Sequence, residues 1–343
     1  MKETEQNSIR SIKSEAEKIL QLINTCNIDF ERLHEYDASA IYVELSRKEA
    51  RENLTDDFSL FEKFFTLSTN INNLAGLINS GYDYGIIERE LDDFQLQIDN
   101  LHGGSALTKY IKQWFFSVKA LLMYRIGKYE EAILLTDWAI DIIDELIDKY
   151  KIYSFVFRLI LQYSNLSNIY FKTGDLNTAT DLRKEILDYL FRGQCNLAPQ
   201  SLKNIELWKE MEFIREYNAI YYFKTTVERI SYFKSTDLNT YNELFNKTIK
   251  PFMDIEILTL ERYYITSWIS TELEFVNQNI LAFFSSVKDF FEEEINSFFK
   301  FLAIYILESM ELIPDINISQ QSLKSSKLRF QNIDEDLFHK KQL

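Results

Sequence analysis

Histidine and cysteine, which often bind transition metals or act in catalysis, are few: the 343 residues include three histidines and two cysteines. Each histidine lies three positions after an acidic residue, in the pairs Glu31/His34, Asp99/His102 and Asp336/His339. Two Glu-x-x-His pairs on facing helices can hold two iron or manganese ions, but only the first pair contains a glutamate. We therefore interpret the pairs as surface contacts and predict neither a metal site nor a cofactor.

The two cysteines, Cys26 and Cys195, lie far apart and form no Cys-x-x-Cys motif. This spacing argues against a disulfide framework or a zinc site, and it fits a reducing compartment. No nucleophile-elbow, P-loop or dinucleotide-binding motif occurs in the sequence. We predict that the protein is not an enzyme; a helical metal-dependent enzyme is a less favoured alternative.

A second group of residues is suited to binding a partner. An aromatic residue followed by a base recurs near the end of three predicted first helices, as Tyr124-Arg125, Phe171-Lys172 and Phe233-Lys234. The pairs stand at the same offset before three turn signals, at Gly127, Gly174 and Thr236. Such bases can hold a carboxylate through charge-assisted hydrogen bonds. Alternatively, the aromatic rings pack between helices and the bases stabilise helix C-termini.

Helices must position these pairs, because the chain has only 8 Gly and 3 Pro. The sequence "YFKTGDLNT" at 170–178 returns as "YFKSTDLNT" at 232–240. Apolar residues at helical spacing flank the first copy, which predicts a helix, a tight turn and a second helix. We expect Gly174 to end the first helix in the left-handed conformation and Asp175 to cap the second.

Small residues recur around the glycines and should let paired helices approach closely: Ala120, Ala132 and Ala139 around Gly127, and Ser167 and Ala179 around Gly174. Together with "GKYEEAI" and "DWAI", these features resemble a tetratricopeptide repeat over 108–190, and more weakly over 56–100 and 210–250. The glycines are 47 residues apart, against a usual period of about 34 for this family.

The resemblance implies an all-α fold in which antiparallel helical hairpins stack into a right-handed superhelix, an α-solenoid. In this family the first helices line a concave groove. The groove residues implied here are Tyr124, Arg125, Asn168, Phe171, Lys172, Phe233 and Lys234.

Three regions are predicted: N-terminal helices that cap the solenoid (1–55), the repeat domain (56–313) and a polar C-terminal tail (314–343), which is either disordered, folded back on the groove or bound to a partner. A stripe at helical spacing marks the first helix, with Ile9, Ile12, Ala16, Ile19, Ile23 and Cys26. We interpret this helix as packing on the repeats. Alternatively, it pairs with a second copy and makes a homodimer.

The net charge of −15 disfavours a nucleic acid as a direct partner. Acidic residues concentrate at 81–99 and 128–149, which we interpret as solvated outer helices; the alternative is a dock for a basic partner. The polar N-terminus and the absence of a long apolar run predict a cytoplasmic protein without a membrane partner.

Taken together, these features predict a non-catalytic scaffold or adaptor that binds another protein or a peptide. The alternative is a peptide-sensing regulator whose groove changes curvature when a peptide binds.

Overall fold

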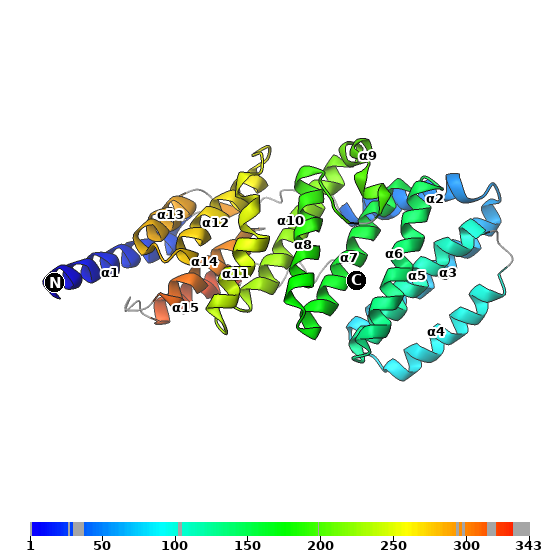
Figure 1. The fold of residues 1–343 in the computed structure, drawn as a ribbon, viewed down its shortest axis with the longest axis horizontal. Coiled ribbons are helices and arrows are strands. Elements are labelled where there is room, and N and C mark those ends of the chain that lie inside the picture. Colours follow the sequence, from blue (N-terminus) through cyan, green and yellow to red (C-terminus); the bar gives the residue numbers. More distant parts are fainter. Residues whose placement is uncertain are drawn as a thin grey trace. The chain divides into compact units, whose positions relative to one another are not determined.

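The computed structural model describes residues 2–26, 28–29, 38–101, 105–197, 199–292, 295–296, 299–313 and 320–331, and these are almost entirely helical (Figure 1). The predicted all-α class is confirmed. The chain divides into two units: Met1–Glu35 with Lys224–Leu343 form unit 1, and Tyr36–Phe223 form unit 2. None of the described helices is long and apolar enough to cross a membrane.

Unit 2 contains, in chain order, α2 (Ala38–Leu54), α3 (Phe58–Asn79), α4 (Tyr84–Asp99), α5 (Ser105–Arg125), α6 (Tyr129–Asp148), η1 (Tyr153–Phe155), α7 (Val156–Thr173), α8 (Leu176–Arg192), η2 (Gln200–Lys203) and α9 (Ile205–Glu210). The division between the units falls within α10 (Glu212–Ser231).

Unit 1 contains α1 (Lys2–Thr25), β1 (Ile28–Asp29), α11 (Leu238–Thr248), η3 (Lys250–Asp254), α12 (Leu260–Val276), α13 (Ile280–Glu292), β2 (Ile295–Asn296), α14 (Lys300–Leu312) and α15 (Gln320–Gln331). The two short strands pair in parallel, with Ile28 opposite Ile295.

Unit 2 is built from helical hairpins whose turns contain glycine. Gly127 follows α5 with φ +82°, and Gly174 ends α7 with φ +88°. A side chain is strained at such angles, and glycine is not. The helices on either side of each glycine pack together, α5 on α6 and α7 on α8, and therefore run antiparallel (Figure 1). The predicted hairpins at both glycines are confirmed.

The small residues lie where two helix backbones approach each other. Ala132, Ala139, Ser167 and Ala179 are all fully buried. In the α7–α8 hairpin, the Ser167 hydroxyl donates a hydrogen bond of 2.8 Å to the Ala179 carbonyl. A direct bond from a side chain to the facing backbone requires close helices, so the predicted role of these positions is confirmed.

The repeated sequence Asp-Leu-Asn-Thr begins a helix in both places. The Asp175 carboxylate accepts a hydrogen bond of 3.1 Å from the Thr178 N–H at the start of α8. Asp237 accepts the equivalent 3.1 Å bond from the Thr240 N–H at the start of α11. The duplication therefore encodes the same N-terminal cap twice.

Replacing Asp175 with alanine should lower the free energy of unfolding by about 1 kcal/mol, because an N–H of the first turn of α8 loses its acceptor. Asp175→Ser is the matched control, since its hydroxyl can accept the same bond. Urea denaturation of the three proteins measures the difference. If the alanine and serine variants are equally destabilised, the cap does not contribute as assigned.

In unit 1, α1 packs against α13 and α15. Ala16, Ile19, Ile23 and Cys26 of its stripe are buried in these contacts, whereas the side chains of Ile9 and Ile12 lie outside the described residues. The interpretation of α1 as a packing helix is therefore supported over this part of the stripe. These four stripe residues are not free to form a homodimer while α1 stays packed.

The C-terminal segment differs from the predicted polar tail. Residues 320–331 form α15, which packs on α14 and α1 and buries Leu323 and Phe330. The predicted region 1–55 is also divided, since α1 belongs to unit 1 and α2 to unit 2. The reason is that contacts distant in sequence, such as the 2.9 Å bond from Ser326 to Asn24, join the two ends of the chain.

The apolar stretch after residue 279 does not form a single helix: α13 ends at Glu292 and α14 begins at Lys300, with β2 between them. Three consecutive glutamates at 292–294 disfavour a longer helix, because negative charges repel one another and the negative end of the helix dipole.

Candidate partner-binding surface

In the α5–α6 hairpin of unit 2, the bases lie on the first helix and the acids on the second. The first helices α5 and α7 carry bases and no acidic residue: Lys109, Lys112, Lys119, Arg125, Arg158 and Lys172. The second helix α6 carries acids and no base: Glu130, Glu131, Asp137, Asp141, Asp144, Glu145 and Asp148. Of the six bases, Arg125 and Lys172 are exposed, three are half-buried and Arg158 is buried.

Tyr124 and Arg125 end α5. The Arg125 guanidinium is exposed, and its Nη2 donates a 2.8 Å hydrogen bond to Oδ1 of Asn79 at the end of α3. The half-buried Tyr124 ring lies 6.0 Å from the ring of Tyr129, across the turn. The aromatic residue therefore packs within its hairpin, and the base stays at the surface.

Phe171 and Lys172 occupy the equivalent place at the end of α7. Phe171 is half-buried, and Lys172 is exposed. Among the residues that the structure describes, the Lys172 ammonium forms no hydrogen bond or ion pair. Asn168, one turn earlier, accepts a 2.8 Å hydrogen bond from Arg183 of α8, so its carbonyl oxygen already has a donor.

A buried polar contact between α5 and α7 was not anticipated. Arg158 of α7 is 7% exposed, and its guanidinium carbon lies 3.6 Å from the centre of the Trp114 ring. Its Nη2 donates a 3.0 Å bond to Gln113 Oε1. This contact ties the two basic helices together. The signal in the sequence is a single arginine within the otherwise apolar start of α7.

Lys234 contradicts the predicted groove. It is 3% exposed, and its Nζ lies 2.7 Å from Glu272 Oε1 on α12. Nζ also lies 2.7 Å from the Ser309 hydroxyl of α14 and donates to it. The prediction that Lys234 is available to a partner is therefore wrong, because this lysine is neutralised inside unit 1.

The surroundings of Lys234 explain why it can be buried. Aromatic rings of Tyr241, Phe275 and Tyr305 lie 4.9, 5.6 and 6.0 Å from Nζ. The Tyr241 hydroxyl and the Ser309 hydroxyl both donate to the Glu272 carboxylate, at 2.7 and 2.9 Å. Every charge thus has partners, as burial of an ion pair requires. Phe233, beside Lys234, is half-buried. Its assignment to the groove remains a prediction from the sequence.

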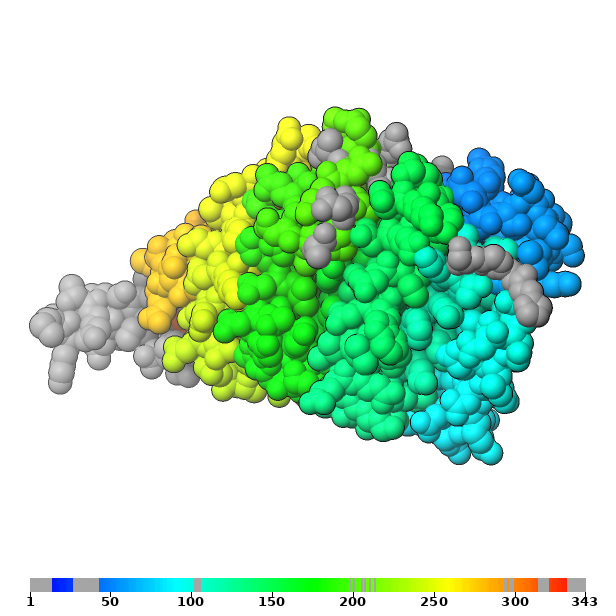
Figure 2. Space-filling model, turned by 45° about the vertical axis from the view of Figure 1, so that its right-hand side comes forward, coloured from blue at the N-terminus to red at the C-terminus, as the bar shows by residue number. Residues whose placement is uncertain are grey.

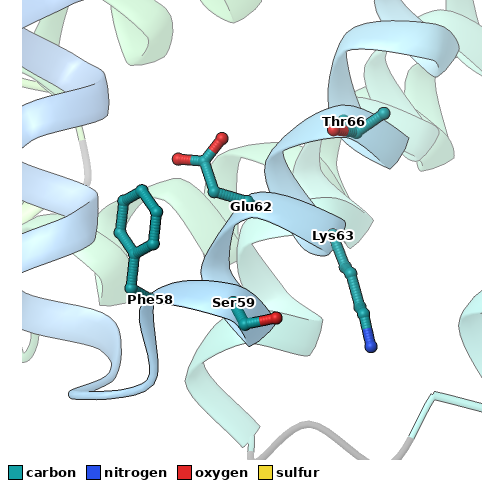
Figure 3. Close-up of a pocket in the computed structure, with 5 residues that line it drawn as sticks. All are labelled: Phe58, Ser59, Glu62, Lys63 and Thr66. Carbon is teal, nitrogen blue, oxygen red and sulfur yellow. The ribbon is translucent and has the colours of Figure 1, made fainter.

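A depression of about 560 Å³ lies along the first turns of α3 and is lined by Phe58, Ser59, Glu62, Lys63 and Thr66 (Figure 3). All of these side chains come from one helix. The Glu62 carboxylate already binds Arg47 at 2.9 Å. This open surface therefore offers no enclosed site for a small molecule.

Of the three histidines and two cysteines, the structure describes only the two cysteines. His34, His102 and His339 lie outside the described residues, and the described part of the chain contains no group of three potential metal ligands. Burial raises the pKa of the Cys195 thiol to about 11 and also raises the pKa of Cys26. Both thiols therefore stay protonated near neutral pH.

Comparison with known proteins gives no relative: no family model matches the chain, and no curated protein or solved structure is significantly similar to it.

Proposed function

We propose that this chain is a non-catalytic scaffold or adaptor that binds another protein or a peptide, through a surface on the first helices of unit 2. The observation that carries the proposal is that α5 and α7 contain no acid and that Arg125 and Lys172, at their ends, are exposed in a chain of net charge −15. Such a local excess of bases attracts an acidic segment or a C-terminal carboxylate.

The proposal includes a tetratricopeptide-like stacking of the hairpins into a right-handed superhelix. Two kinds of contact support it: α3 packs on α5, and the second helix α6 packs on the next first helix α7. In successive hairpins that stack in this way, residues at the same distance before their turns lie on the same side of the stack. Arg125 and Lys172, which share an offset, are then neighbours on that side.

Binding at this surface should depend on several weak contacts. An exposed pair of Lys or Arg with a carboxylate contributes about 0.2–1 kcal/mol, and salt screens it. Arg125 and Lys172 would act with the half-buried Tyr124 and Phe171, whose rings would add apolar contact area. We therefore expect modest affinity for acidic peptides and a clear decrease as the salt concentration rises.

The test is a panel of labelled peptides with free C-terminal carboxylates, either acidic or basic, titrated against the full chain. Arg125→Glu with Lys172→Glu should abolish binding of the acidic peptides. The matched control is Arg89→Glu with Lys209→Glu, which changes the net charge equally at exposed positions on α4 and α9 and should bind normally. Unchanged binding of the acidic peptides by the first double variant, or equal loss of their binding in the control, contradicts the proposal.

A further inference from the structure

The second helix α6 presents two large apolar side chains to solvent. Leu134 is 47% exposed and Trp138 is 44% exposed. They are four residues apart, so they lie on the same face of the helix one turn apart. Residues of the α5–α6 range lie on the face of unit 2 seen in Figure 2, in teal-green. Tryptophan is enriched among the residues that contribute most binding energy at protein interfaces.

The Trp138 ring is held in place before any partner binds. Phe116 of α5 contacts it edge to face, with ring centroids 5.3 Å apart and an interplanar angle of 61°. A side chain that is already positioned loses less conformational entropy on binding. Trp138 therefore has the properties of an anchor residue.

Carboxylates surround this apolar pair. Glu130, Glu131, Asp137 and Asp141 each lie three or four residues from Leu134 or Trp138. Within the described part of the chain, these four form no ion pair and their carboxylates accept no hydrogen bond. Other acids of α6 do have partners: Glu145 pairs with Lys109, and Asp144 accepts a 2.6 Å bond from Ser201.

Two of the four carboxylates have no evident structural role. Glu130 and Glu131 stand in the first turn of α6, where the helix dipole favours negative charge. Asp137 and Asp141 stand in the middle of the helix, one turn apart, where their charges repel. Partial burial and the neighbouring Asp141 both raise the pKa of Asp137. A cationic partner would relieve this repulsion.

We propose that Leu134 and Trp138, with Glu130, Glu131, Asp137 and Asp141, form a docking surface for a basic amphipathic segment of another protein. Apolar side chains of the segment cover the leucine and the tryptophan, and its lysines and arginines pair with the four carboxylates. This surface, called the α6 docking surface below, is distinct from the basic one on α5 and α7. It adds a second partner class to the proposed function and does not depend on it.

Charge complementarity selects this occupant. A nucleic acid or an anionic lipid surface would be repelled by the four carboxylates. A second copy would bring another chain of net charge −15 to an acidic surface. A basic segment with an apolar face satisfies both features of the α6 docking surface, because it covers the exposed rings and neutralises the charges around them.

The probe is a labelled Lys/Leu peptide of about 18 residues, which makes about five helical turns, titrated by fluorescence anisotropy. A Glu/Leu peptide with the same leucine spacing tests the role of charge. A Lys/Ser peptide tests the role of the apolar face. We expect the Lys/Leu peptide to bind the full chain, the Lys/Ser peptide to bind much more weakly, and the Glu/Leu peptide not to bind.

The variants locate the site on α6. Trp138→Ala should weaken Lys/Leu binding about tenfold or more, and Asp137→Asn with Asp141→Asn should weaken it several-fold and flatten its salt dependence. The matched control is Leu96→Ala, which removes an exposed leucine (62%) from the other acidic helix, α4, and should leave binding unchanged. Thermal melting checks that each variant is folded, and Trp138→Phe, which keeps an aromatic anchor, should retain most of the affinity.

Several results would overturn the proposal. One is equal loss of binding in Leu96→Ala and Trp138→Ala, which would mean that any acidic helix with an exposed leucine suffices. Another is equal binding of the Lys/Leu and Glu/Leu peptides. A third is self-association of the wild-type chain that Trp138→Ala abolishes, which would identify a second copy as the occupant.

Discussion

Replacing Lys234 with alanine is expected to lower the free energy of unfolding by about 3–5 kcal/mol, because it leaves a fully buried carboxylate without its cation. Glu272 is 0% exposed and lies 2.7 Å from the lysine ammonium. The Tyr241 and Ser309 hydroxyls that bind the carboxylate cannot neutralise it. Urea denaturation, followed by circular dichroism, measures the loss.

Two further variants show whether the effect belongs to the buried ion pair. Lys250→Ala removes an exposed lysine and should change stability by less than about 0.5 kcal/mol. The double variant Lys234→Met with Glu272→Leu removes both charges, so it should be less destabilised than Lys234→Ala. If Lys234→Ala unfolds at the same urea concentration as the wild type, Lys234 is not buried as described.

The second large effect is expected at Ala132 of α6, which is fully buried in a helix that packs on both α5 and α7. Ala132→Phe should destabilise unit 2 by about 1–3 kcal/mol, because a phenyl ring has no room where two helices approach closely. A thermal melt of the purified variant should show a lower midpoint than the wild type.

Leu134→Phe is the control on the same helix. It also introduces a phenyl ring, two positions later, but at a side chain that is 47% exposed. Its melting midpoint should stay close to that of the wild type. A large decrease for this variant, or none for Ala132→Phe, would contradict the assignment of the two faces of α6.

The two proposed surfaces of unit 2 have opposite charge and would select different partners. The bases of α5 and α7 suit an acidic segment, whereas the α6 docking surface suits a basic one. A scaffold with both could hold two dissimilar proteins on a single unit. Under this proposal, the Arg125/Lys172 charge reversal and Trp138→Ala should each remove one partner class and spare the other.

The local features of the hairpins follow from short segments of the sequence. Glycine at positive φ at Gly127 and Gly174, and a carboxylate before the helix at Asp175 and Asp237, depend on interactions within a few residues. Such interactions act in the same way wherever the segment lies in the fold. The all-α class, the turns and the buried alanines could therefore be predicted.

Residues with the same local sequence can have different surroundings, and long-range packing sets this difference. Lys172 and Lys234 stand in the same local sequence, Tyr-Phe-Lys, yet the first is exposed and the second is buried beside Glu272. The packing of α15 against α1 could not be predicted from the sequence either. The physical reason is that burial depends on groups distant in the chain, and neither composition nor spacing states which of them meet.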